Sequence, residues 1–290
     1  MPVPQHAGSP VLPRKRLGNA LRSLRERNGY TLDHVASRLL ISVSKLSRLE
    51  KAQGLPQLRD VRDLVSFYEL DETEGERLMR WAREGRRKGW WTSYDDVLQP
   101  EEHAFIGYEN EATTTLQYAI PIVPGLLQTE SYCREVISHW NPQFSESELE
   151  RRVQIRLTRQ QNLTSRELSR PLELRAVLHE SCLIQSVGSA DALREQLETL
   201  VTFSKLDNVD IRILLMSADP HAAIASMFQH FAFGDDIDRD IVFIESATGI
   251  QYVEDEFMVR RFERWYTELE RRSLDPAMSV ARINDALAAL

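Results

Sequence analysis

The stretch TLDHVASRLLISVSKLSRLEKA, residues 31–52, predicts two short helices joined by a tight turn. Thr31 is placed to cap the first helix and Ser42 the second, because a hydroxyl at this position accepts a hydrogen bond from a backbone N–H of the first turn. Apolar residues recur at helical spacing in both segments, so each helix should bury one face. These inward residues are Val35, Ala36 and Leu39 in the first helix, and Leu46 and Leu49 in the second.

The second helix leaves mainly small polar and basic side chains on its outer face. Two crossed helices of this kind form a helix-turn-helix, whose second helix lies in the DNA major groove and reads base edges. We therefore expect a DNA-binding surface. Its predicted residues are Ser42, Val43, Ser44, Lys45, Ser47, Arg48 and Lys51. The alternative interpretation is a helical hairpin without a DNA role, because short motifs produce false matches.

The flanking segments complete a compact helical domain. Amphipathic patterns predict one helix before the motif, over residues 16–25, and two after it, over 58–68 and near 71–88. Together these five helices give an all-α domain over residues 14–88. Residues 1–13 are polar and proline-rich and lack the apolar core of a signal peptide, so we expect a disordered arm there.

The run LSRLEK, residues 46–51, resembles the phage-repressor-like family of DNA-binding domains, also called the xenobiotic-response-element type. The resemblance covers about residues 14–70. It implies that Val43, Ser44 and Arg48 face bases, and that Ser42 and Lys51 face phosphates. It also implies a buried ion pair between Arg25 and Glu50, which ties the first helix to the recognition helix.

Two positions depart from that family pattern. Leu40 stands where a glycine normally makes the turn, and Ala52 replaces the glycine that usually follows the recognition helix. A left-handed conformation costs an L-residue about 1–2 kcal/mol. The turn at Leu40 is therefore expected to be either strained or differently shaped.

The length of 290 residues suggests two domains, and the contents of 42% hydrophobic and 28% charged residues are typical of globular proteins. No run of 18 apolar residues is present, so we expect no membrane span. Cys133 and Cys182 lack metal-ligand spacing and fit reduced thiols in the cytoplasm.

The net charge of −8 divides unevenly along the chain. Residues 1–70 hold 12 Lys and Arg against 6 Asp and Glu, a net charge of +6, whereas the remainder holds 24 against 38, a net charge of −14. The basic part coincides with the predicted DNA-binding motif, as phosphate contact requires. The acidic part should repel DNA and serve another purpose.

The rest of the chain, residues 89–290, predicts an α+β domain. Its alternating apolar runs predict a small, mostly antiparallel sheet, and longer periodic segments predict helices between and after the strands. Strands are expected at 113–122, 172–178, 209–215, 227–233 and 241–244, with a further pairing at 250–253. Helices are expected at 129–140, 146–163, 190–204, 255–271 and 279–290.

The segment IVPGLLQTESY, residues 122–132, resembles the "V-P-G-L-L-Q-T-x-x-Y-A" stretch of one group of actinobacterial regulators, with Cys133 in place of the last Ala. The group includes WhiJ-type developmental regulators and Scr1-type antitoxin-like regulators, in which a repressor-like domain precedes a shared C-terminal domain. The resemblance covers most of the chain. It implies a cytoplasmic transcriptional regulator that often works with a small protein encoded beside it.

Residues 179–183, HESCL, begin like a zinc-peptidase motif, but position 183 is Leu where the second His is needed. We interpret His221 and His230 as ordinary polar residues, and the acidic run 235–240 as a solvated hairpin loop because it lacks the pattern of a calcium loop. The sequence therefore predicts no enzyme, no cofactor and no metal site.

An aromatic group around residues 90–108 is either a ligand or partner site or part of the core of the second domain, and aromatic residues favour the core. The candidate site residues are Trp90, Trp91, Tyr94 and Tyr108.

We expect a sequence-specific transcriptional regulator, in particular a repressor, that binds operator DNA as a homodimer. Its second domain would receive a signal from a small-molecule effector or from a small protein encoded nearby. The alternative function is an antitoxin-like regulator that mainly binds and neutralises such a partner.

Overall fold

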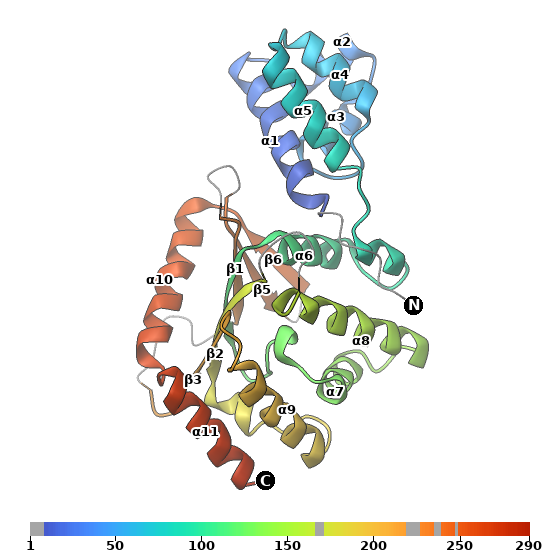
Figure 1. Ribbon diagram of the computed structural model, residues 1–290. Coiled ribbons are helices and arrows are strands. Elements are labelled where there is room, and N and C mark those ends of the chain that lie inside the picture. Colours follow the sequence, from blue (N-terminus) through green and yellow to red (C-terminus); the bar gives the residue numbers. More distant parts are fainter. Residues whose placement is uncertain (1–8, 166–170, 219–226, 235–238, 247–248) are drawn as a thin grey trace. The chain divides into compact units, whose positions relative to one another are not determined.

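The computed structural model describes residues 9–165, 171–218, 227–234, 239–246 and 249–290 (Figure 1). The chain forms two compact units. The first unit contains residues 9–93 and 103–111, and the second contains residues 94–102 and the described part of 112–290. Among the described helices, none has the length and apolar character needed to cross a bilayer.

The first unit is helical, as the sequence predicts. Its first five helices are α1 (Val11–Arg27), α2 (Leu32–Leu39), α3 (Val43–Glu50), α4 (Leu58–Phe67) and α5 (Glu72–Glu84). Residues 1–8 of the expected arm lie outside the described residues, but α1 begins at Val11, so the end of the 1–13 segment is helical. Helix α6 (Pro100–Glu111) contributes residues 103–111 to this unit, and a Cβ on Gly107 would come within 2.2 Å of Val11 on α1.

The start of each motif helix follows from its capping residue. The Thr31 hydroxyl accepts a hydrogen bond from the His34 amide at 3.1 Å, and the Ser42 hydroxyl accepts one from the Lys45 amide at 3.2 Å. The apolar faces of the five helices then meet in one core. Its most deeply buried members include Leu17, Leu21, Val35, Ala36, Leu46, Val61, Leu64 and Leu78.

The second unit is built on a six-stranded sheet. The strands are β1 (Thr114–Ala119), β2 (Glu173–His179), β3 (Val209–Leu214), β4 (Phe228–Ala232), β5 (Ile241–Ser246) and β6 (Gly249–Val253), in the order β3-β2-β1-β4-β5-β6. The β1–β2 and β2–β3 pairs are parallel, and the other pairs are antiparallel. The expectation of a mostly antiparallel sheet is therefore wrong. The sheet is mixed because helices connect β1 to β2 and β2 to β3, as parallel neighbours require.

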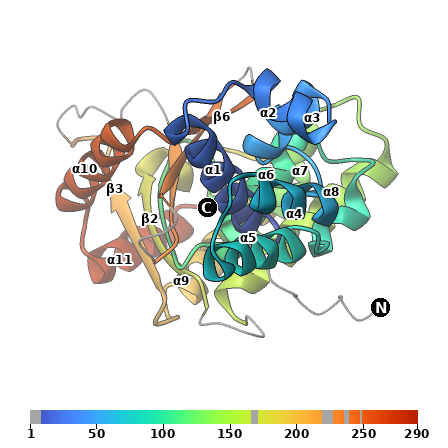
Figure 2. The ribbon, with the colours of Figure 1, turned by 90° about the horizontal axis from the view of Figure 1, so that it is seen from above.

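Helices lie on both faces of this sheet (Figures 1 and 2). Helix α10 (Glu256–Arg272) covers one face, where Phe262 and Tyr266 pack among Tyr118, Val177 and Phe228. The other helices of this unit are α7 (Glu130–Trp140), α8 (Glu146–Gln160), α9 (Ala190–Phe203) and α11 (Pro276–Ala288), with 3-10 turns at Gly125–Leu127, Gln161–Leu163 and Glu180–Leu183. A further 3-10 turn, Trp90–Tyr94, belongs to the first unit up to Ser93. Helices α7, α8 and α9 lie on the face away from α10.

The segment that carries the second resemblance, residues 122–132, joins these helices to the sheet. The Gln128 side chain donates to the carbonyl of Val123 at 2.7 Å and accepts from Arg156 of α8 at 2.7 Å. The buried Gln196 of α9 accepts from the Thr129 amide at 2.9 Å and donates to the carbonyl of Leu127 at 2.7 Å. This segment therefore has a structural role as the junction of α7, α8 and α9.

The turn between α2 and α3 contains a strained residue. Leu40 has φ 55° and ψ 38°, the left-handed region that favours glycine, and its side chain is 93% exposed. Ala52, just after α3, has φ 59°. Of the two expected possibilities, a strained turn or a turn of a different shape, the strained turn is therefore correct. The Leu40 side chain makes no buried contact with the described residues that would offset this strain.

Replacing Leu40 with Gly should stabilise the first unit by about 0.5–1 kcal/mol, because relief of the left-handed strain exceeds the extra backbone entropy of glycine. Hydrogen exchange of the α2 and α3 amides measures this locally. Leu40→Ala is the control, since it removes the same exposed side chain but keeps the Cβ, and it should gain little. An equal gain in both variants would show that side-chain exposure, not backbone strain, is responsible.

Candidate DNA-binding surface

The outer face of α3 collects most of the predicted DNA-contacting residues. Ser42, Val43, Ser44, Arg48 and Lys51 are exposed, while Lys45 and Ser47 are half-buried. Arg48 makes no ion pair with the described residues, so its guanidinium is available to a ligand. The exposed side chains of this face are hydroxyls, one valine and two cations. Groups of these types contact base edges and bind phosphates in DNA-binding proteins.

Lys45 differs from the other cations of this helix. Its Nζ lies 2.6 Å from Oδ2 of Asp60 on α4, and the Asp60 side chain is only 11% exposed. Much of the Lys45 charge is therefore balanced within the protein. Sequence reasoning placed Lys45 on the DNA face and missed Asp60, because helical spacing within α3 gives no information about which side chain of α4 comes alongside.

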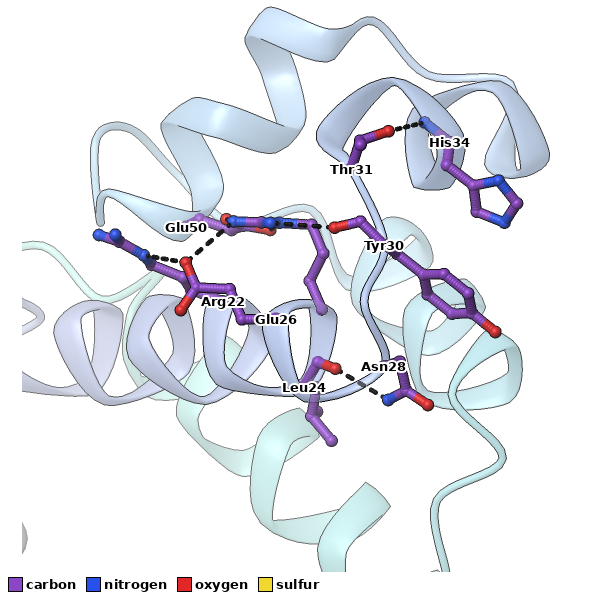
Figure 3. A network of polar contacts seen from close by, with 9 residues as sticks. Arg22, Leu24, Glu26, Asn28, Tyr30, Thr31, His34 and Glu50 are labelled. Atoms are coloured by element: carbon purple, nitrogen blue, oxygen red, sulfur yellow. Dashed lines mark hydrogen bonds and ion pairs between the residues drawn. The ribbon is translucent and has the colours of Figure 1, made fainter.

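The end of α3 is fixed by an ion pair with α1. Arg25 Nε lies 2.8 Å from Glu50 Oε1, and Arg25 Nη2 lies 2.8 Å from Glu50 Oε2, so the pair is bidentate. Figure 3 labels Glu50 among the residues of this polar network. Glu50 is buried, with 6% exposure. Arg25 Nη1 also donates to the carbonyl of Tyr30, at 3.1 Å. The hydrogen bond to Glu50 is the main cause that raises the pKa of the Arg25 guanidinium above its usual value.

Gly18 allows the backbones of α1 and α3 to touch. A Cβ on Gly18 would lie 2.7 Å from the carbonyl oxygen of Glu50 and 2.9 Å from that of Leu49. These distances are too short for any side chain, and both neighbours are backbone atoms. Together with the Arg25–Glu50 pair, this contact fixes the orientation of the recognition helix.

The aromatic residues considered as a ligand or partner site are not gathered in one unit. Trp90, Trp91 and Tyr108 belong to the first unit, and Tyr94 belongs to the second. The rings of Trp90 and Trp91 meet edge to face at 5.9 Å, and Trp91 and Tyr108 are buried. Tyr94 lies against the Arg151 guanidinium, 5.2 Å from its ring centroid. Trp91 and Tyr108 are therefore core residues, but of the first unit and not of the second domain as expected.

The peptidase-like stretch at the end of β2 makes structural contacts. His179 Nδ1 lies 2.7 Å from the Ser181 hydroxyl. The Glu180 carboxylate accepts from the Met216 amide at 2.8 Å and from Arg282 at 2.7 Å, and these contacts link β2, β3 and α11. Desolvation lowers the pKa of the His179 imidazole below its usual value. His221 lies outside the described residues.

Comparison with known protein families identifies both parts of the chain. Residues 16–78 match the family model described as a helix-turn-helix domain. Residues 103–285 match the model of a domain of unknown function, DUF5753. No curated protein and no solved structure matches the chain. The helix-turn-helix prediction is confirmed, whereas the WhiJ-type and Scr1-type relationship stays a prediction.

Removing either partner of the Arg25–Glu50 pair should destabilise the first unit by about 3–5 kcal/mol, because the remaining charge stays buried without compensation. Arg25→Ala and Glu50→Ala are measured by hydrogen exchange of the α1 and α3 amides. The control is Glu26→Ala, whose carboxylate is 52% exposed, pairs with Arg22 at 2.8 Å and lies 3.5 Å from Arg25 Nη2. Because this carboxylate is exposed, its removal should cost less than about 1 kcal/mol.

The double variant Arg25→Met with Glu50→Leu should recover a large part of the loss, because an apolar pair leaves no buried charge. Equal losses in Glu26→Ala and Glu50→Ala would contradict the assigned role of the buried pair.

Proposed function

Because the chain belongs to the family defined by the DUF5753 domain and carries a helix-turn-helix domain ahead of it, we propose that it is a sequence-specific DNA-binding transcriptional regulator. The observation that supports the proposal best is the outer face of α3. That face presents Ser44, Arg48 and Lys51 to solvent while the helix end is fixed by Glu50. The net charge of +6 over residues 1–70 favours phosphate contact in the same region.

Each exposed residue of this face has a distinct proposed role. Arg48 is long and forked, so it reaches two acceptors on one guanine edge. The Val43 side chain contacts the methyl group of a thymine. Ser42, at the start of α3, and Lys51, at its end, contact phosphates, and such contacts position the helix without reading sequence. Lys45, held by Asp60, stabilises α3 against α4.

The protein acts as a homodimer on two half-sites about one helical turn apart, because a single short helix contacts few base pairs. Bound at a promoter it represses by excluding the transcription machinery. The second unit holds 18 Lys and Arg against 31 Asp and Glu, a net charge of −13, so it is repelled by DNA and is free to receive a signal. A signal that favours one dimer geometry changes the half-site spacing and therefore the affinity for the operator. In this proposal the protein works in the cytoplasm and catalyses no reaction.

A second candidate function is neutralisation of a small partner protein, as in antitoxins. The acidic excess of the chain after residue 70 favours a basic partner. Several apolar side chains of the second unit are also exposed, among them Trp140, at 52%, and Ile184, at 54%. Co-purification with a basic protein encoded next to this gene, together with loss of DNA affinity in the complex, would favour this candidate.

The DNA-binding proposal is tested on an operator selected from random-sequence DNA by the intact protein. Arg48→Ala should weaken binding to that operator by about 1–3 kcal/mol and relax the preference at one base pair. Lys51→Ala should weaken binding to all sequences alike and reduce the slope of log K against log salt by about one unit. Binding is measured across a salt series on the operator and its single-base variants.

The control is Arg271→Ala, which removes an exposed cation of α10, 68% exposed, and should leave operator binding unchanged. If Arg48→Ala weakened operator and random DNA by the same factor, the assignment of α3 as the base-reading helix would be wrong. If no sequence were enriched by the intact protein, sequence-specific binding itself would be excluded.

A further inference from the structure

Three potential metal ligands meet on the α10 face of the sheet. His230 lies in β4, Asp240 directly precedes β5, and Glu263 lies in α10. Their ligand atoms all lie within 4.8 Å of one another. His230 Nε2 lies 3.3 Å from Asp240 Oδ2 and 3.3 Å from Glu263 Oε1. All three residues belong to the second unit, so their arrangement does not depend on the placement of the first.

The His230 imidazole is buried, and its ring nitrogens lack hydrogen-bond partners among the described residues. The residue is 2% exposed. Buried polar groups in folded proteins are almost always hydrogen-bonded, so an orphaned imidazole needs an explanation. Its Nε2 is directed at two carboxylates that belong to different elements.

The distances fit coordination to a shared ion better than direct hydrogen bonding. A charge-assisted N–H···O hydrogen bond measures about 2.7–2.9 Å, whereas both N···O separations here are 3.3 Å. Two ligand atoms that each lie about 2.0–2.1 Å from a tetrahedral zinc ion are separated by about 3.3–3.4 Å. We propose that His230, Asp240 and Glu263 form a binding site for a divalent transition-metal ion, of which Zn²⁺ fits best.

The donor set determines the class of metal. An imidazole nitrogen with two carboxylates suits first-row transition ions, whereas Mg²⁺ and Ca²⁺ prefer oxygen donors alone. The carboxylate side of the site reaches solvent, because the side chains of Asp240 and Glu263 are 30% and 41% exposed. The ion therefore has a path of entry, and a water molecule can complete the coordination.

The bound ion would connect α10 to the antiparallel half of the sheet. Phe262, next to Glu263, already packs on Phe228 of β4, with ring centroids 5.0 Å apart. The metal would add a polar link at the same place and bring the loop end at Asp240 against the helix. Neither the spacing of His230 and Asp240 nor the helix pattern around Glu263 indicates such a site in the sequence, since the three converge only in the folded sheet.

The test uses the full-length protein, first stripped with a chelator and dialysed. Titration calorimetry with ZnCl₂ should show one saturable site, and MgCl₂ should show none. The substitutions Glu263→Gln and Asp240→Asn keep the shape of each side chain but remove its charge. The double variant that carries both should bind Zn²⁺ at least about tenfold more weakly. His230→Ala should abolish the site. Glu268→Gln is the matched control, an exposed carboxylate on the same helix that pairs with Arg271 and Arg272, and it should bind Zn²⁺ like the parent.

Thermal unfolding gives a second readout. Zn²⁺ should raise the melting temperature of the parent and of Glu268→Gln, and should raise that of the double variant Glu263→Gln with Asp240→Asn less at the same concentration, because weaker binding to the folded state stabilises it less. Zn²⁺ binding that is unchanged in Glu263→Gln and Asp240→Asn would overturn the proposal, and so would the absence of Zn²⁺ binding by the parent. Since the assay contains no DNA, its outcome is independent of whether the protein binds an operator.

Discussion

The orientation of the recognition helix depends on the charge pair between Arg25 and Glu50. Glu50 is the last residue of α3 and is buried, so its carboxylate is tolerated there only because a bidentate guanidinium faces it. The same guanidinium holds the carbonyl of Tyr30, directly before α2. One side chain of α1 therefore fixes both ends of the helix-turn-helix, and Gly18 provides the space for the close backbone contact beside it.

Helices α1 to α5 could be predicted from the sequence because their determinants are local, whereas α6, beyond the expected limit at residue 88, was not predicted. Thr31 and Ser42 cap helices a few residues away from themselves, and the apolar spacing of each helix shows its inward face. The sequence leaves two possibilities for the turn at Leu40, a strained left-handed conformation or a different turn shape, and the structure has the left-handed conformation. The Lys45–Asp60 pair could not be predicted, because it depends on how α4 lies against α3.

The strand order and the pairing direction in the sheet could not be predicted from local sequence patterns. Alternation predicted the strands of the second unit, but it does not determine which strands become neighbours. The parallel pairing of β1 with β2 and of β2 with β3 results from the helical crossovers between them, whereas the strand patterns alone favour antiparallel neighbours. His230 and the acidic loop end at Asp240 were interpreted separately as ordinary polar features. Their approach to Glu263 follows from strand order and from the packing of α10, neither of which is encoded in a short motif.

The central place of β1 in the sheet has a consequence for synthesis of the chain. Its contacts reach far along the sequence: Thr114 meets Glu173 across 59 residues, and Thr115 meets the His230 carbonyl across 115 residues. Helices α1 to α5, by contrast, are complete by Glu84. Distant contacts form slowly, and chains emerge from the ribosome N-terminus first. The helices that bear the DNA-reading surface therefore assemble while β1 still lacks β4. A chain whose synthesis ends in between contains the complete helix-turn-helix but only part of the sheet.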